Sequence, residues 1–308
     1  MTTTDKPSIP PRIVLIVGIL AVSTASLFIR FAQREAPSLV VATYRLTIAS
    51  LLLTPFILWR FRKDLFAITI RQFLPMALAG LLLAFHFASW ITSLSLTSVA
   101  SSVVLVTTTP LWVAIASVVF LKERLSRGLI LGLLLAMAGG IVVALSQSCA
   151  ITSSRLQCDL REVFLNRASL TGNLLALAGA WFAAAYLVIG RKVRETTQTM
   201  LYVYIVYSAS AVCLLLACLI TNQSLFAYSP RFFLWAFLLA LIPQIIGHTT
   251  YNWALGYLPT TFVSISLLGE PIGTIFLAFL FLQETPTPIE AVGGLLILLG
   301  IYLSSRSN

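Results

Sequence analysis

The sequence is dominated by long apolar runs that recur along almost its whole length. Runs such as IVLIVGILAVSTASLFI and MLYVYIVYSASAVCLLLACLI are close to the roughly 20 residues that a helix needs to cross a bilayer. Only 10% of the residues are charged, whereas a soluble domain has about a quarter charged residues. The sequence therefore predicts an all-α integral membrane protein. Many runs follow the first one, which is longer than a signal-peptide core, so we expect it to be retained as a span.

Charged and turn-rich breaks divide the apolar runs into ten candidate transmembrane helices. Their expected ranges are 12–31, 38–59, 72–93, 98–121, 128–146, 170–190, 199–220, 232–254, 259–282 and 289–304. With a cytoplasmic N-terminus, thirteen Lys and Arg residues fall on the cytoplasmic side and six on the other. The positive-inside rule thus predicts that both termini are cytoplasmic. We expect a multi-pass protein of the plasma (inner) membrane. Because the basic residues cluster in short connections, the net charge of +10 reflects topology, and we expect no nucleic-acid partner.

The two halves of the chain resemble each other. A shift of 161 residues superposes TPLWVAIASVVFLKERLSRGLILGLLLAMAG on EPIGTIFLAFLFLQETPTPIEAVGGLLILLG and matches Pro110 with Pro271 and Glu123 with Glu284. We therefore divide the chain into a first repeat (12–146), a linker (147–169) and a second repeat (170–304). Because each repeat has an odd number of spans, the repeats should be inverted, a common plan of secondary transporters with a site near the midplane.

The chain resembles the EamA-type, ten-helix branch of the drug/metabolite transporter superfamily over nearly its whole length. The resemblance rests on APSLVVATYRLTIA, LTSVASSVVLVTTTPLW…FLKERLS and YNWALGYLPTTFVSISLLGEPIG…FLQE. The first span departs from the family, because it reads AVSTAS where members often carry a Trp-Gly pair. The resemblance implies a transporter whose third, sixth and eighth helices face the centre.

Glu270 and Pro271 interrupt the ninth apolar run. A charge at the bilayer centre costs at least about 2.5 kcal/mol, so Glu270 should face the bundle interior, either in a static hydrogen-bond network or in a substrate cavity. Proline has no amide hydrogen and disrupts a helical bond. Pro110 and Pro271 are thus expected kinks at matching positions, which serve as hinges or only shape the helices.

A polar stripe marks the eighth span, where Gln244, His248 and Asn252 recur every four residues with Tyr251 beside them. The third span carries His86 and, four residues later, Trp90. Histidine exchanges protons near neutral pH, so proton coupling is one hypothesis; hydrogen-bonded core histidines are the alternative. The candidate substrate-cavity residues are His86, Trp90, Trp181, Gln244, His248, Tyr251, Asn252 and Glu270.

Other polar and small residues have structural interpretations. Arg45 is expected to snorkel outward, and Glu123 and Glu284 to hydrogen-bond backbone at helix ends. Glycines of the fifth and tenth spans suggest close helix packing or a homodimer contact. Cys149 and Cys158 share the linker and are expected to be free thiols, with a disulfide as the alternative.

The leading functional hypothesis is a secondary transporter, not an enzyme, that moves a small metabolite, such as an amino acid, an amine or a related amphiphile, with export as the expected direction. No Walker-type glycine loop, HExxH motif or nucleophile elbow is found, and we expect no cofactor and no metal site. A channel or facilitator is the main alternative, followed by an intramembrane enzyme and a structural membrane partner.

Overall fold

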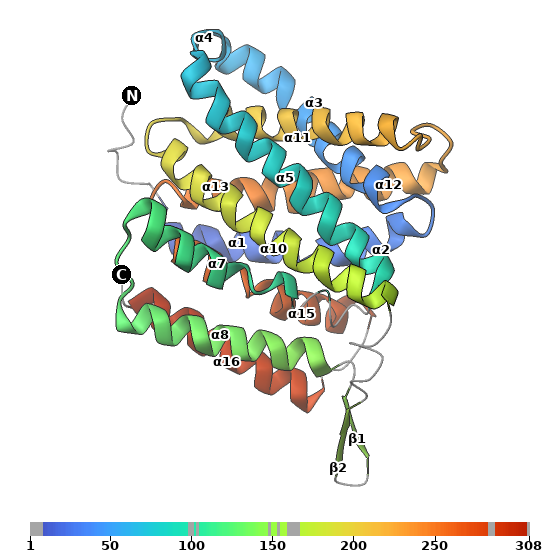
Figure 1. Cartoon of the computed structure of the whole chain (residues 1–308), viewed down its shortest axis with the longest axis vertical. Helices are drawn as coiled ribbons and strands as arrows, with labels where there is room; N and C mark the ends of the chain where they lie inside the picture. The colour runs from blue at the N-terminus through green and yellow to red at the C-terminus, as the bar shows by residue number, and fades with distance from the viewer. Residues whose placement is uncertain are drawn as a thin grey trace.

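The chain folds into a bundle of long helices with one small hairpin, as Figure 1 shows in a computed structural model. The structure describes residues 9–97, 102, 105–146, 149–152, 155–158, 167–282 and 287–306. The first-half elements are α1 (Pro11–Ser23), α2 (Ala25–Gln33), α3 (Ser38–Arg60), α4 (Arg62–Phe66), α5 (Ile70–Leu96), α7 (Thr109–Ala116), the π-helix η1 (Ser117–Leu121) and α8 (Arg127–Ser146). After the strands β1 (Cys149–Thr152) and β2 (Arg155–Cys158) come α10 (Arg167–Arg194), α11 (Thr199–Ile220), α12 (Pro230–Leu239), the π-helix η2 (Ala240–His248), α13 (Thr249–Ala254), α14 (Thr260–Leu267), α15 (Glu270–Leu282) and α16 (Pro288–Arg306).

Much of the described chain is suited to a bilayer. Seven helical segments are long and apolar enough to cross a membrane, namely Pro11–Gln33, Ser38–Arg60, Ile70–Leu96, Leu170–Arg194, Thr199–Ile220, Pro230–Ala254 and Thr260–Leu277. Three shorter apolar helices, Thr109–Leu121, Arg127–Val143 and Ala291–Arg306, lie in the predicted fourth, fifth and tenth spans. The described chain is therefore a helical fold with the length and composition of a membrane protein, while the count of ten spans stays a prediction.

The ends of the helices agree with an even number of crossings. The start of α1, the start of α8, the end of α10 and the end of α16 all lie on the left in Figure 1, and the β1–β2 hairpin lies on the right. The hairpin occupies the predicted linker, and its register makes Cys149 the direct backbone partner of Cys158. The compartment that each end faces remains the prediction of the charge distribution.

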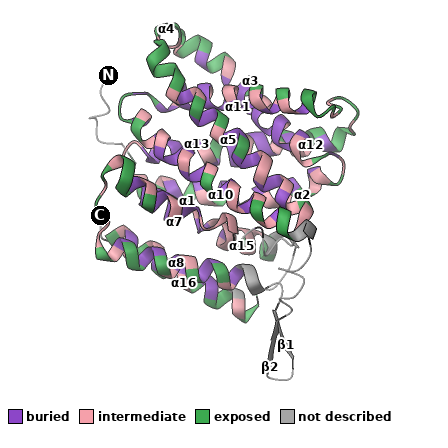
Figure 2. Cartoon of the chain, viewed as in Figure 1, coloured by how far each residue is buried: buried purple, intermediate pink, exposed green. Residues whose placement is uncertain are grey.

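Apolar side chains cover the outside of the bundle as well as its interior. Figure 2 shows exposed residues on the outward faces and buried ones between the helices. The exposed set includes Leu51, Trp59 and Ile220, which are 64%, 80% and 79% exposed. Such large exposed apolar residues are expected where lipid, and not water, surrounds the protein.

Glycines allow α8 and α16 to pack against each other at the lower edge of the view in Figure 1. A Cβ atom added at Gly139 would lie 2.5 Å from the Gly293 carbonyl oxygen, and one at Gly300 would lie 2.5 Å from that of Gly132. Small residues permit such close backbone approach in membrane helices. These glycines therefore serve the contact between α8 and α16 of the same chain.

Replacing Gly139 by alanine should destabilise the α8–α16 pair, because overpacking typically costs about 1–3 kcal/mol. The matched control is Gly140→Ala, where the nearest atom would lie 3.8 Å from the new Cβ. Both changes bring the same gain in helix propensity. We expect Gly139→Ala to melt at a lower temperature than Gly140→Ala in detergent; equal melting temperatures would contradict the contact.

Candidate functional site

The best candidate site is a buried cavity of about 100 Å³ at the centre of the bundle, which corresponds to roughly three water molecules. Side chains from both halves of the chain line it, including residues of α3, α5, α10, η2 and α13. The charged, polar and aromatic members of this wall are Arg45, His86, Trp90, Thr107, Thr109, Tyr186, His248, Tyr251 and Glu270. The wall is mostly apolar and carries a few convergent polar groups, which is the kind of lining that ligand sites have.

Arg45 is fully buried, so the expectation that it snorkels outward is wrong. Its Nε donates to the Oε1 atom of Gln244 at 2.7 Å, and its Cζ atom lies 4.1 Å from the centroid of the Phe87 ring. Both contacts stabilise a cation away from water. Its Nη1 and Nη2 atoms have no hydrogen-bond partner in the described part of the chain. Arg45 therefore lines the cavity and keeps two nitrogen donors without a partner among the described residues.

The residues of the polar stripe in the eighth span have two different positions: some line the cavity, and the others hydrogen-bond to the residues that line it. Pro243 lies inside η2, a π-helix, and π segments frequently occur at functional sites. His248 lines the cavity. Gln244 is buried behind it and holds Arg45. Asn252 donates to the Tyr186 hydroxyl and, at 2.7 Å, to the backbone oxygen of His248.

His86 and Trp90 lie together on the cavity wall. The Nδ1 atom of His86 lies 2.9 Å from the carbonyl oxygen of Gly179, which joins α5 to α10. Its ring stacks on that of Trp90 with centroids 5.9 Å apart. The ring of His248 makes an edge contact with Phe87 at 5.4 Å. Both histidines thus reach one cavity from the third and eighth spans.

The ninth span is broken beside the cavity, since α14 ends at Leu267 and α15 begins at Glu270. The backbone oxygen of Glu270 accepts hydrogen bonds from Ser23 Oγ and Thr274 Oγ1, both at 3.0 Å. Pro271 follows Glu270 directly, and Pro110 occupies the first turn of α7, where the missing amide hydrogen is tolerated. The matched prolines therefore begin helices; Pro110 lines the cavity, and Pro271 does not.

Arg45 and Glu270 face the same cavity without touching. Among the described residues the only ion pair joins Arg191 and Glu123, so no salt bridge links Arg45 to Glu270. The wall of one cavity therefore carries both a basic and an acidic side chain.

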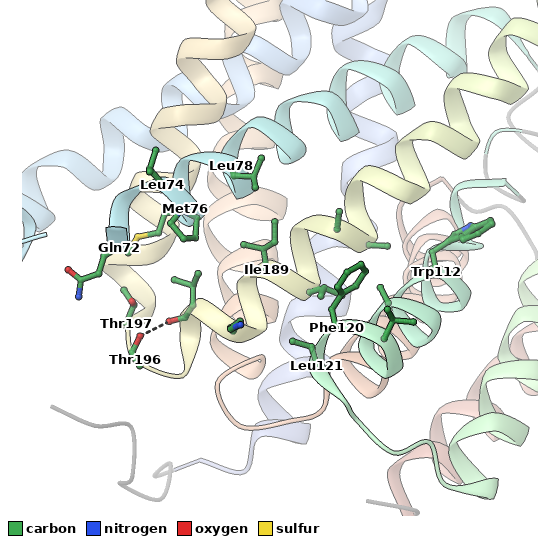
Figure 3. Close-up of a pocket in the computed structure, with 18 of the residues that line it drawn as sticks. Gln72, Leu74, Met76, Leu78, Trp112, Phe120, Leu121, Ile189, Thr196 and Thr197 are labelled. Atoms are coloured by element: carbon green, nitrogen blue, oxygen red, sulfur yellow. Dashed lines mark hydrogen bonds between the residues drawn. The ribbon is translucent and has the colours of Figure 1, made fainter. Parts of the chain in front are cut away.

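Trp181 lies elsewhere, on a larger lateral groove between α5, α7, η1 and α10 (Figure 3). The groove has a volume of about 1230 Å³ and mostly apolar walls. Trp181 is 48% exposed, and its ring makes an edge contact with Trp112 at 5.4 Å. We favour the smaller cavity as the substrate site because Arg45 and Glu270, two side chains of opposite charge, line it.

A polar cluster closes the bundle at the end where α1 begins. The Oε1 atom of Glu123 accepts from the backbone nitrogen and the hydroxyl of Thr260 at 3.4 and 3.3 Å, which confirms the expected helix-end role of Glu123. Arg191 lies 3.9 Å from the same carboxylate oxygen and donates to the Leu255 carbonyl at 2.6 Å. These contacts connect the two halves of the chain. Glu284 lies outside the described residues.

No metal site is found within the described ranges, where no group of three or more His, Cys, Asp and Glu residues could hold an ion. Among the charged, polar and aromatic residues of the cavity wall, the sequence singled out His86, Trp90, His248, Tyr251 and Glu270, and it missed Arg45, Thr107, Thr109 and Tyr186. A charge inside an apolar span is the signal that could have indicated Arg45.

Comparisons with known proteins agree on one class of protein, the membrane transporters. The model of the EamA-like transporter family matches residues 11–145 and 170–306. An uncharacterized transporter of Archaeoglobus fulgidus is 22% identical over 96% of this chain and 98% of its own length. An uncharacterized transporter of Synechocystis is 25% identical over 80% of this chain and 67% of its own length. A protein of known crystal structure has the same fold, with a TM-score of 0.75 and 19% identity over 96% of each chain.

Replacing Gln244 by leucine should destabilise the protein by about 1–3 kcal/mol, because the Nε atom of buried Arg45 loses its acceptor. Gln244→Glu keeps an acceptor oxygen and should be destabilised less. Gln198→Leu, at an exposed position, is the control. Thermal unfolding in detergent measures the order; a Gln244→Leu variant as stable as the control would contradict the role of this bond.

Proposed function

Because the chain belongs to the EamA-like transporter family, we propose that this membrane transporter is a secondary carrier that exports a small amphiphilic metabolite by alternating access. The observation that carries the proposal is the cavity shared by Arg45 and Glu270. We place the carrier in the plasma (inner) membrane, with both termini in the cytoplasm and two inverted five-helix repeats (12–146 and 170–304) joined by a linker (147–169).

The groups on the cavity wall favour an amino acid over a simple amine. The two free nitrogens of Arg45 form a planar pair of donors that suits a carboxylate. Glu270 suits an ammonium group, and the apolar wall residues suit a side chain. A substrate with both charges would neutralise both buried groups at once, whereas an amine would leave Arg45 unpaired.

Glu270 also offers a route to proton coupling. A bare carboxylate at membrane depth is unfavourable, and either a proton or the substrate's ammonium group relieves it. If the two exchange on one carboxylate, a proton entering the cell drives the substrate out. His86 and His248, on the same wall, would carry the proton toward this carboxylate.

Reconstituted protein tests the proposal. Liposomes preloaded with a mixed pool of amino acids, amines and small metabolites are assayed for efflux by mass spectrometry, with and without a pH gradient. We expect saturable efflux of one class, accelerated when the outside is acidic. Arg45→Leu should abolish it, Glu270→Gln should abolish its dependence on the gradient, and the exposed control Asp64→Asn should retain both. Efflux that never saturates would favour a channel; efflux equal to that of protein-free liposomes would contradict the carrier.

The cluster around Glu123 is the proposed cytoplasmic gate, since its contacts cross between the halves. Glu123→Ala should weaken this closure. In a variant whose only cysteine replaces Ala183 on the cavity wall, a maleimide added from the cytoplasmic side should then react several-fold faster. Asp64→Asn serves as the control. An unchanged labelling rate would show that these contacts do not close the path.

A further inference from the structure

The lateral groove is larger than the central cavity and has no place in the proposed transport cycle. Its walls come from α5, from α7 with η1, and from α10. Figure 3 shows Leu74, Leu78, Ile189 and Phe120 around it, with Trp112 at one end and Gln72, Thr196 and Thr197 at the other.

The long walls of the groove are apolar and accessible. Leu74, Ile115 and Val119 are 58%, 50% and 62% exposed. In a membrane-embedded bundle an open apolar groove is filled by acyl chains more readily than by water. The shape alone does not select one lipid over another.

One end of the groove is polar and basic. Arg71 and Lys192 line it together with Gln72, Thr196 and Thr197. Within the described residues neither cation forms an ion pair. The first residues of α5 and α11 also lie here, at Ile70 and Thr199, and helix N-termini favour anions. This end therefore matches a negatively charged group.

The length of the groove matches one leaflet. Trp181 and Lys192, both on its wall, are separated along α10 by about 16 Å at 1.5 Å per residue. One leaflet contributes roughly half of the 30 Å hydrocarbon core. An acyl chain can thus run from the basic end toward Trp181 and Trp112.

We propose that the lateral groove binds an anionic phospholipid of the leaflet at the Arg71 end. The phosphate lies between Arg71 and Lys192, near the hydroxyls of Thr196 and Thr197, and one acyl chain follows α10 to Trp181. Juxtamembrane Lys and Arg attract anionic headgroups, and the apolar walls add specificity for a lipid over free phosphate. The site is separate from the central cavity and does not depend on the transported substrate.

Native mass spectrometry of delipidated protein tests this site. The probes are dioleoyl phosphatidylglycerol, dioleoyl phosphatidylcholine and inorganic phosphate. We expect tight retention of phosphatidylglycerol only, and a loss of roughly tenfold or more in its apparent affinity in the double variant Arg71→Gln/Lys192→Gln. The control is Arg60→Gln/Arg62→Gln, which removes two cations of the α3–α5 connection that do not line the groove.

Three results would overturn the proposal. Equal losses in both double variants would mean general surface attraction, and equal retention of the two phospholipids would mean no charge selection. A change in the dimer fraction of Arg71→Gln/Lys192→Gln, with lipid retention unchanged, would assign the groove to a second copy of this chain.

A second readout follows the acyl chain and not the headgroup. Phosphatidylglycerol with brominated acyl chains should quench tryptophan fluorescence, and the quenching should fall in Trp112→Phe/Trp181→Phe more than in Trp59→Phe. Ala185→Phe should fill the groove and reduce phosphatidylglycerol retention although both cations remain. Unchanged quenching and unchanged retention in these variants would place the lipid elsewhere.

Discussion

The central constraint on this molecule is the burial of a guanidinium group at membrane depth. Arg45 is fully buried, and an uncompensated charge there is strongly unfavourable. Gln244 from the eighth span and Phe87 from the third supply its hydrogen bond and its aromatic contact. The burial of this one charge thus ties together three spans, and two nitrogens of the same group have no partner among the described residues.

If Arg45 had only a structural role, the folded state would be more stable with a complete set of hydrogen-bond partners for it, or with an apolar residue in its place. The structure leaves Nη1 and Nη2 of Arg45 and the hydroxyl of Tyr251 without partners among the described residues. These groups, together with Glu270, surround the same small space. An unpaired set of this kind does not favour stability, and it fits the proposal that a ligand completes these bonds.

Local sequence features were sufficient to predict much of the fold. Apolar length located the membrane helices, and the need to hide an acid located Glu270 at the interior. The partner of Arg45 lies 199 residues away, and no local pattern encodes that contact. Trp181 shows the complementary limit, because an aromatic residue on a central helix can face either side, and helical periodicity in an all-apolar span does not distinguish them.

The helix break beside the cavity suggests which part of the bundle could move during transport. Helices interrupted beside a site leave short segments whose ends can shift while the rest of the bundle stays packed. Here the break before α15 places Glu270 at the first turn of a helix, and α14 begins at Thr260, which Glu123 of the other half holds. Because α14 carries the chain between these two points, a movement that releases Glu123 would also displace the residues beside Glu270. The contact proposed as the gate and the acid of the cavity are thereby connected through the eight residues of α14.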